Sequence, residues 1–495
     1  MNDVLLGFSV VFQPNHLLSC FLGVVVGQIV GVLPGLGPVG AMSLLLPFTF
    51  YIDPISAIIM LAGIYIGAQY GGTITSVLLN IPGEATTVVT ALDGYQMAKQ
   101  GRAGPALAIA AFGSFIAGTL STFGLIMFSR PLSSFSTKFG APEYFSLIML
   151  GIILSIYLAS GSILKALLSA FLGLWVSCIG LEVSSSTPRF TFGSVTLMDG
   201  VGIVPICMGL FGISEVLFNI EKAIGKKVIA MKIGKLLPTF KDWRDSIGAI
   251  LRGTGLGFLL GILPGGGAVI ASFLSYSVEK RISKHPETFG KGAIEGVAAP
   301  ESANNAGAQG GFIPLLNMGL PTNIVMAILL GALLIHGLRP GPFLISQNPR
   351  LFWGLIVSMY VANAMLLVMN IPLIAIWIRI LKIPYFLLFP LILLFCVVGA
   401  YGNNTSIIDV YSMILFGGLG YVARKFDFEP APFVLAYVLG PLLEENFVMS
   451  LTESRGNLSI FFRSSISVTF LMIDLLVIIG SILPFLRRKR EVLKE

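Results

Sequence analysis

The chain has 495 residues, of which 55% are hydrophobic and 11% are charged, and its mean hydropathy is +0.90. Soluble domains carry about 25% charged residues, so this composition excludes a soluble multidomain protein, a disordered chain and a small disulfide-stabilised fold. It indicates a polytopic helical membrane protein. The net charge of +7 comes from basic residues in short loops between apolar runs, where the positive-inside rule explains them without a nucleic-acid partner.

Apolar runs follow one another along nearly the whole chain, each long enough to cross about 30 Å of hydrocarbon. In chain order they lie near 16–50 (interrupted), 55–80, 106–128, 143–160, 162–180, 199–220, 247–279 (interrupted), 311–336 (interrupted), 351–379, 384–401, 405–423, 431–447 and 459–485. They predict an all-α polytopic membrane protein with about twelve transmembrane segments. Leu17-Leu18-Ser19-Cys20 resembles a lipoprotein cleavage site, but no basic residue precedes it and the apolar run continues through it. We therefore interpret it as part of the first membrane segment.

Basic residues concentrate between the two halves of the chain and at its end. The polar stretch from Glu221 to Arg252 and the tail Arg487–Arg490 are both rich in Lys and Arg, which places them in the cytoplasm. We divide the chain into a first membrane half (1–220), a basic cytoplasmic linker (221–246), a second membrane half (247–485) and a basic cytoplasmic tail (486–495).

Three motifs of the first half recur in the same order in the second. Gly27-Gln-Ile-Val-Gly-Val-Leu-Pro-Gly-Leu-Gly37 returns 230 residues later as Gly257-Phe-Leu-Leu-Gly-Ile-Leu-Pro-Gly-Gly-Gly267. The second motif, Gly67-Ala68-Gln69 followed by Asn80-Ile81-Pro82, returns as Gly307-Ala308-Gln309 followed by Gly319-Leu320-Pro321. The third, Gly101-Arg102-Ala103-Gly104-Pro105, has a looser counterpart in Gly337-Leu338-Arg339-Pro340-Gly341-Pro342. The order predicts a shared ancestor for the two halves.

Charge placement predicts that the halves have opposite orientations. The second half starts from the basic linker, whereas the first carries Asp3 and no Lys or Arg before Lys99. After the first motif the first half has Asp53 and no basic residue, while the equivalent part of the second half is basic at Lys280 and beyond. Inverted repeats with broken helices or re-entrant hairpins are typical of secondary transporters.

The two Leu-Pro-Gly motifs each interrupt an apolar run. Proline breaks a helix and glycine permits backbone angles that other residues avoid, so each motif predicts two half-helices. The N-terminus of a half-helix presents unpaired N–H groups and a partial positive charge that suit an anion, although a kink for packing would give the same pattern. As substrate-binding residues we predict Pro34, Gly35, Leu36, Gly37, Pro264, Gly265, Gly266 and Gly267.

The second motif pair is polar. Its amide and hydroxyl groups suit a hard cation or carboxylate oxygens, and helix caps or loops are the structural alternative. We add Asn80, Pro82, Gly83, Thr86 and Thr87 to the substrate site and assign Asn304, Asn305, Gly319, Pro321, Thr322 and Asn323 to cation binding. Four carboxyl groups lie near these motifs, at Glu84, Asp93, Glu295 and Glu301. Glu301 is the strongest candidate among them, with helix capping as the alternative.

Enzyme-like motifs lack their structural context. Gly35-Leu36-Gly37-Pro38-Val39-Gly40 fits a dinucleotide-binding pattern but lies inside a membrane run, and Ser162-Ile163-Leu164-Lys165 lacks its companion motifs. Four scattered cysteines and three histidines indicate neither a disulfide framework nor a metal site. We therefore predict no catalytic residues, no metal and no cofactor beyond a coupling Na⁺ or H⁺.

The chain resembles the large membrane subunit of the tripartite tricarboxylate transporter family (TctA-type) over nearly its whole length. The resemblance is carried by Gly31-Val32-Leu33-Pro34-Gly35-Leu36-Gly37-Pro38, Leu61-Ala62-Gly63-Ile64-Tyr65, Leu79-Asn80-Ile81-Pro82-Gly83, Ala91-Leu92-Asp93-Gly94-Tyr95 and Pro300-Glu301-Ser302-Ala303-Asn304-Asn305. Gln96 stands where the family usually has proline, and Gly319-Leu320-Pro321-Thr322-Asn323 replaces a commoner Gly-Ile-Pro-Gly form. These departures leave the transported acid undetermined between citrate and another organic anion.

The resemblance implies a multi-pass protein of the bacterial inner membrane that imports small carboxylates with a cation gradient. Its implied partners are a small membrane subunit and a periplasmic solute-binding protein, with lipid around it, and a homodimer is left open. A channel or passive facilitator for organic anions is the alternative function. A structural or sensory membrane protein, in which the repeat is only a scaffold, is a further one.

Overall fold

The computed structural model describes residues 2–33, 37–159, 162–182, 186–222, 234–265, 267–381, 385–404 and 406–492. The first half contains α1 (Asn2–Val11), α2 (Pro14–Val32), α3 (Gly37–Leu45), η1 (Leu46–Tyr51), α4 (Pro54–Leu79), η2 (Ala85–Thr87), α5 (Val88–Lys99), α6 (Ala103–Ser136), α7 (Ala141–Tyr157), α8 (Ile163–Ser177), β1 (Gly180–Leu181), β2 (Pro188–Arg189), η3 (Thr196–Asp199), α9 (Ile203–Cys207), the π-helix η4 (Met208–Ile213) and α10 (Ser214–Lys222).

The second half contains α11 (Phe240–Gly261), α12 (Gly267–Ile282), η5 (Pro286–Thr288), α13 (Glu295–Gly310), α14 (Phe312–Met318), α15 (Ile324–Ile335), α16 (Leu344–Gln347), α17 (Pro349–Asn370), α18 (Ile374–Ile380), α19 (Tyr385–Asn404), α20 (Ile407–Lys425), α21 (Pro430–Glu453), η6 (Leu458–Phe462) and α22 (Ser465–Val492). β1 and β2 form one short antiparallel pair. The helical content and the apolar helices confirm an all-α membrane protein.

Six of the described helices are long and apolar enough to cross a membrane, and they are α2, α4, α6, α17, α20 and α21. Several shorter apolar helices accompany them, among them α7, α8 and α15. The total of about twelve spans therefore stays a prediction. The run predicted at 351–379 is divided between α17 and α18, because Pro372 lies just after the end of α17.

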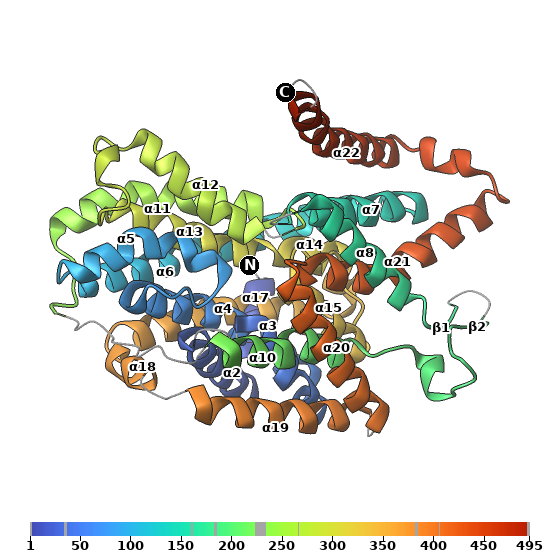
Figure 1. Cartoon of the computed structure of the whole chain (residues 1–495), viewed down its shortest axis with the longest axis horizontal. Helices are drawn as coiled ribbons and strands as arrows, with labels where there is room; N and C mark the ends of the chain where they lie inside the picture. Colours follow the sequence, from blue (N-terminus) through green and yellow to red (C-terminus); the bar gives the residue numbers. More distant parts are fainter. Residues whose placement is uncertain are drawn as a thin grey trace.

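Two helix groups flank the centre of the molecule (Figure 1). On one side α11, α12 and α13 pack with α5 and α6, and on the other α7 and α8 pack with α21. The last helix, α22, runs along α7 at the edge of the molecule. The linker predicted over 221–246 is partly helical, since α11 begins at Phe240 behind a Thr239 cap that accepts from the Asp242 N–H.

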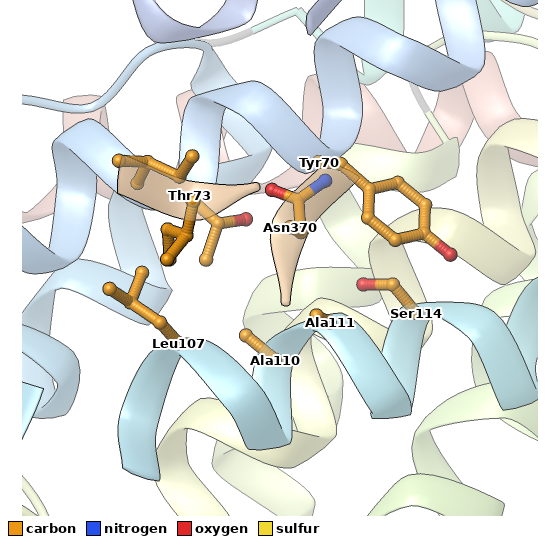
Figure 2. Close-up of a pocket in the computed structure, with 9 residues that line it drawn as sticks. Tyr70, Thr73, Leu107, Ala110, Ala111, Ser114 and Asn370 are labelled. Atoms are coloured by element: carbon orange, nitrogen blue, oxygen red, sulfur yellow. The ribbon is translucent and has the colours of Figure 1, made fainter. Parts of the chain in front are cut away.

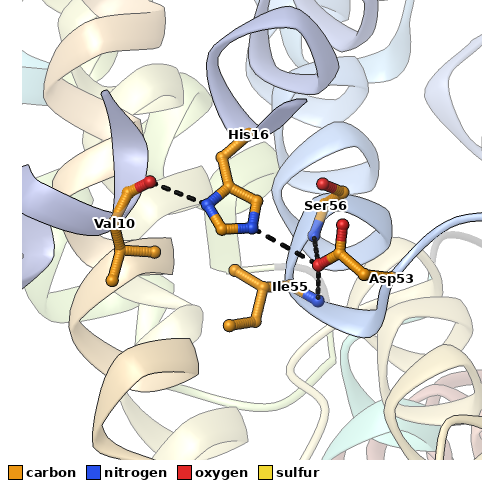
Figure 3. A network of polar contacts seen from close by, with 5 residues as sticks. All are labelled: Val10, His16, Asp53, Ile55 and Ser56. Atoms are coloured by element: carbon orange, nitrogen blue, oxygen red, sulfur yellow. Dashed lines mark hydrogen bonds and ion pairs between the residues drawn. The ribbon is translucent and has the colours of Figure 1, made fainter. Parts of the chain in front are cut away.

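α4 is the most enclosed of the long helices, with 94% of its apolar window buried. Its start is fixed by Asp53, whose Oδ1 accepts from the N–H groups of Ile55 (3.1 Å) and Ser56 (3.0 Å). His16 of α2 lies 3.3 Å from the same oxygen and 2.7 Å from the carbonyl of Val10 (Figure 3). These bonds tie α1, α2 and α4 together at one end.

Glycines allow two helix pairs to touch backbone to backbone. A Cβ placed on Gly27 of α2 would lie 2.2 Å from the Ile64 carbonyl of α4, and one on Gly257 of α11 would lie 2.2 Å from the Ala303 carbonyl of α13. The glycines one turn to either side, at 23 and 31 and at 253 and 261, make the same approach. Small residues at this spacing are a usual device for close helix packing in membranes. The α2–α4 and α11–α13 contacts are the most extensive in the molecule.

The backbone after these pairs also follows one pattern in both halves. The chain turns left-handed at Asn80 (φ 55°) after α4 and at Gly319 (φ 73°) after α14. Four residues later it is extended, at Glu84 (φ −151°, ψ 169°) and at Asn323 (φ −155°, ψ 177°), before the next helix begins. The succession of broken helix, buried helix, turn and cap therefore occurs twice.

Candidate functional site

Both predicted helix breaks are present. In the first half α2 ends at Val32 and α3 begins at Gly37, while Pro34, Gly35 and Leu36 lie outside the described residues. In the second half α11 ends at Gly261 and α12 begins at Gly267, and Gly266 lies outside the described residues.

The second break requires glycine at two positions. Gly265 has φ +102°, and a Cβ there would lie 2.8 Å from the Leu154 carbonyl of α7. A Cβ on Gly267 would lie 2.0 Å from the Leu260 carbonyl. Pro264 directly precedes Gly265, and its ring lies against Gly151, also on α7. The break is thus held closely against a neighbouring helix.

Each break contacts the polar motif of its own half. A Cβ on Gly83 would lie 2.5 Å from the Gly31 carbonyl, in the last turn of α2. The Gly265 N–H donates to the Thr322 carbonyl at 2.8 Å. The Thr322 hydroxyl is buried without a hydrogen-bond partner, and a Cβ on Gly311 would lie 2.5 Å from it.

The first polar motif divides into exposed and buried residues. Asn80 and Pro82 are exposed, and Asn80 closes α4 in the left-handed conformation. Thr86 donates to Gln69 Oε1 (3.3 Å), whereas Thr87 accepts from Ser76 (2.8 Å) and donates to the Glu84 carbonyl (3.0 Å). The structure therefore brings Thr86 and Thr87 into the interior but leaves Asn80 and Pro82 at its edge.

In the second polar motif, Asn323 and Gly319 have clear structural roles. The Asn323 Oδ1 caps α15 by accepting from the Met326 N–H (3.0 Å), and its Nδ2 donates to the Tyr65 hydroxyl (3.2 Å). Gly319 closes α14, and Pro321 is buried beside it. Helix capping, the alternative to a binding role, accounts for part of this motif.

Asn304 and Asn305 of α13 are buried deep in the molecule. Asn305 is 1% exposed and donates to Ser114 Oγ (2.8 Å) and to the Glu301 carbonyl (3.1 Å), and its Oδ1 has no partner. Asn304 is 0% exposed, and neither its Oδ1 nor its Nδ2 has a partner. A buried amide without partners costs about 1–3 kcal/mol, so an arrangement of this kind suits a ligand.

Glu301 joins the two halves. It is 0% exposed and accepts from the hydroxyls of Thr73 on α4 and Thr90 on α5, each at 2.7 Å. Within the described part of the chain, no Lys, Arg or His forms an ion pair with it. Thr73 and Thr90 were not among the predicted site residues, although Thr73 belongs to the polar string Gly72–Ser76 that leads into the first polar motif.

More polar groups continue this interior array along α13, α4 and α17. Thr122 donates to Gln309 Oε1 (2.6 Å) and Tyr70 donates to Asn363 Oδ1 (3.3 Å), while the Gln309 Nε2 and the Asn363 Nδ2 have no partner. Gln28 and Asn370 form a reciprocal amide pair (2.9 and 3.1 Å). None of these residues was predicted as part of the site.

A small cavity opens beside the Glu301 contacts (Figure 2). Thr73, Tyr70, Ser114 and Asn370 supply its polar lining, and Ala110 and Ala111 of α6 face it with small side chains. Thr73 and Ser114 are also the partners of Glu301 and Asn305. The cavity is therefore continuous with the buried polar array.

The array contains hydroxyls, amides and carboxylates, and among the described residues no Lys, Arg or His forms an ion pair with its carboxylates. Such oxygen-rich groups coordinate hard cations, and free amide N–H groups can bind carboxylates. The described residues hold no group of three His, Cys, Asp or Glu side chains arranged for a metal ion. The chemistry that these groups offer is the binding of small ions.

Comparison with known proteins gives a consistent result. A model of the tripartite tricarboxylate transporter TctA family matches residues 17–435. An "Uncharacterized 52.8 kDa protein in TAR-I ttuC' 3'region" of Agrobacterium vitis is 48% identical over 491 residues, which cover 99% of this chain and 98% of that protein. An "Uncharacterized protein in TAR-II ttuC' 3'region" of the same organism is 51% identical over 235 residues, covering 48% of this chain and 97% of that protein. No solved structure matches.

Proposed function

The chain belongs to the tripartite tricarboxylate transporter TctA family, and from this premise we propose that it is the large membrane subunit of a secondary active importer of small organic carboxylates. The family is one of transporter components, so the chain is a multi-pass transport protein that works with partner subunits. The observation that carries the proposal is the buried array around Glu301, Asn304 and Asn305, whose polar groups outnumber the partners that the protein itself provides.

The two halves are inverted repeats in this proposal. Supporting it are the glycine contacts of α2 with α4 and of α11 with α13, and the matching turns at Asn80 and Gly319. The basic linker before α11 and the acidic start of the chain support opposite orientations. Repeats of this kind gather their broken helices around a shared site near the middle of the membrane.

The substrate is a dicarboxylate or tricarboxylate that binds at the half-helix N-termini of α3 and α12. Unpaired N–H groups and the helix dipole favour its negative charge there. Gly265 and Gly267 support this placement indirectly, because they let the second break pack closely against α7 and the end of α11 and so fix where α12 begins.

The coupling cation, Na⁺ or H⁺, offsets the charge of the substrate. Asn304, Asn305 and Thr322 support a cation site because each is buried with a free oxygen. Gly319 and Asn323 fix the ends of α14 and α15 on either side of Thr322, and Pro321 precedes it. The transporter acts in the bacterial inner membrane with a small membrane subunit and a periplasmic binding protein.

Uptake by vesicles tests this function. The complete complex, with binding protein added outside, is given radiolabelled citrate or a dicarboxylate under an inward Na⁺ gradient, an inward H⁺ gradient or neither. We expect accumulation that needs both a gradient and the binding protein. Equilibration without a gradient and without the binding protein would show a passive facilitator instead.

A further inference from the structure

Two carboxyl groups approach the same turn of α4, that of the buried Glu301 and that of the half-buried Glu84. Glu301 Oε2 accepts from the hydroxyl of Thr73 (2.7 Å). On the adjacent residue, a Cβ placed on Gly72 would lie only 3.3 Å from the Cγ of Glu84. Glu84 Oε1 is buried and has no hydrogen-bond partner. The two acidic side chains, one from each half of the chain, thus approach the adjacent residues Gly72 and Thr73.

No positive side chain balances these two groups. Of the ion pairs among the described residues, none includes Glu84 or Glu301. A carboxylate removed from water without a counter-charge is strongly unfavourable, so buried charges are paired, bound to a metal ion or neutralised. The arrangement therefore calls for a positive species from solution.

Neutral oxygens lie beside the Glu301 carboxylate and along the same stretch of α4. The hydroxyl hydrogens of Thr73 and Thr90 point to Glu301, which leaves their oxygen lone pairs free to face a cation. Gln69, one turn before Thr73, receives the Thr86 hydroxyl on its Oε1. An oxygen-only set of this kind is what hard cations prefer.

Asn304 is an independent sign of a ligand at this point. It is 0% exposed, and neither of its side-chain polar atoms has a partner. It follows Glu301 by one turn on the same face of α13, and helical side chains lean towards the preceding turn. Asn304 and Glu301 therefore share one face of α13.

We propose that a single Na⁺ ion binds between Glu84 and Glu301, with oxygens of Thr73, Thr90 and Asn304 completing its shell. The proposal rests on the cation-coupled function above and deepens it, because it moves the centre of the cation site from the amides alone to two carboxylates. Since each half supplies one carboxylate, the ion holds the halves together across α4 and α13.

The test is Na⁺ binding by the purified full-length chain, without substrate or partner subunits. Binding of radioactive Na⁺ and the midpoint of thermal unfolding are measured while Na⁺ replaces choline, in parallel series at two fixed pH values. We expect Na⁺ to bind and to raise the midpoint of the wild type. Glu301→Gln and Glu84→Gln keep the side-chain size, and we expect each to weaken the apparent Na⁺ affinity at least about ten-fold, or about 1.4 kcal/mol.

Glu279→Gln is the matched control. Glu279 is also a buried carboxylate (3% exposed), but it is already paired with Arg252, so its replacement should leave the Na⁺ response intact. No Na⁺-dependent change in the wild type, or an equal response in Glu301→Gln, would overturn the site. So would a midpoint that responds to pH alone, since a proton would then be the bound species. Because transport is not measured, failure here is distinct from failure of gradient-driven uptake.

Discussion

At Asn304, a role in ligand binding would outweigh a loss of stability. Its amide is 0% exposed and makes no hydrogen bond, a state that costs about 1–3 kcal/mol. Functional sites commonly retain groups that lower stability, because activity depends on those groups.

Replacing Asn304 by alanine should therefore separate stability from transport. In buffer with choline in place of Na⁺, we expect Asn304→Ala to leave the midpoint of thermal unfolding unchanged or to raise it, because it removes an unsatisfied amide. Gradient-driven uptake should fall at least about ten-fold, or about 1.4 kcal/mol in transition-state free energy. Both are measured on the same preparation.

The control for this substitution is Asn446→Ala on α21. The Asn446 amide donates to the Leu442 carbonyl (2.7 Å) and lies away from the α13 array, so uptake should be preserved. Unchanged uptake in Asn304→Ala would remove this residue from the binding site.

The sequence could indicate some site residues but not others. Glu301, Asn304 and Asn305 form a compact polar motif inside an apolar stretch, which marks them without a structure. Thr73 and Thr90 stand among other hydroxyl residues on different helices, and threonine commonly bonds to its own helix, so nothing distinguishes these two. Only the packing of α4 and α5 on α13 brings these hydroxyls to Glu301.

At the scale of helices, the glycine contacts set how closely α11 and α13 approach. Gly257→Ala would place a methyl group 2.2 Å from the Ala303 carbonyl, so the helices must separate. Overpacking of this kind typically costs about 1–3 kcal/mol, and we expect a lower thermal midpoint in detergent.

Gly255→Ala on the same helix provides the comparison. A Cβ there meets nothing within 4 Å, so the midpoint should stay the same or rise slightly, because alanine restricts the unfolded chain more than glycine does. Equal losses in both variants would mean that helix propensity, and not close packing, explains these glycines.

Helix positions followed well from hydrophobic runs and from proline. The Leu-Pro-Gly motifs ended α2 and α11 where predicted, because proline cannot continue the hydrogen-bond ladder. The division between α17 and α18 was not predicted, although Pro372 lies there. A single proline is often accommodated in a membrane helix, so Pro372 alone does not predict a helix end. The last residue of α17, Asn370, is also bonded to Gln28, which is distant in the sequence.

At the scale of the whole molecule, the two halves share one polar interior. Glu301 of the second half is held by Thr73 and Thr90 of the first, and Asn323 is bonded to Tyr65. A ligand bound there would contact both halves and would respond to their relative movement. The proposed transport depends on the opposite orientation of the two halves, because this arrangement would make the polar interior reachable from each side of the membrane in turn.

Labelling of two equivalent loops tests that claim most directly. Tyr51 at the end of η1 is 78% exposed, and the His285 side chain before η5 is 72% exposed. Tyr51→Cys and His285→Cys would be introduced separately with Cys178→Ser, since the other three cysteines, Cys20, Cys207 and Cys396, are buried. In intact cells, a membrane-impermeant maleimide should label Tyr51→Cys from the periplasmic side, whereas His285→Cys should be labelled only after the inner membrane is opened. Labelling of both positions from the same side would contradict the inverted arrangement.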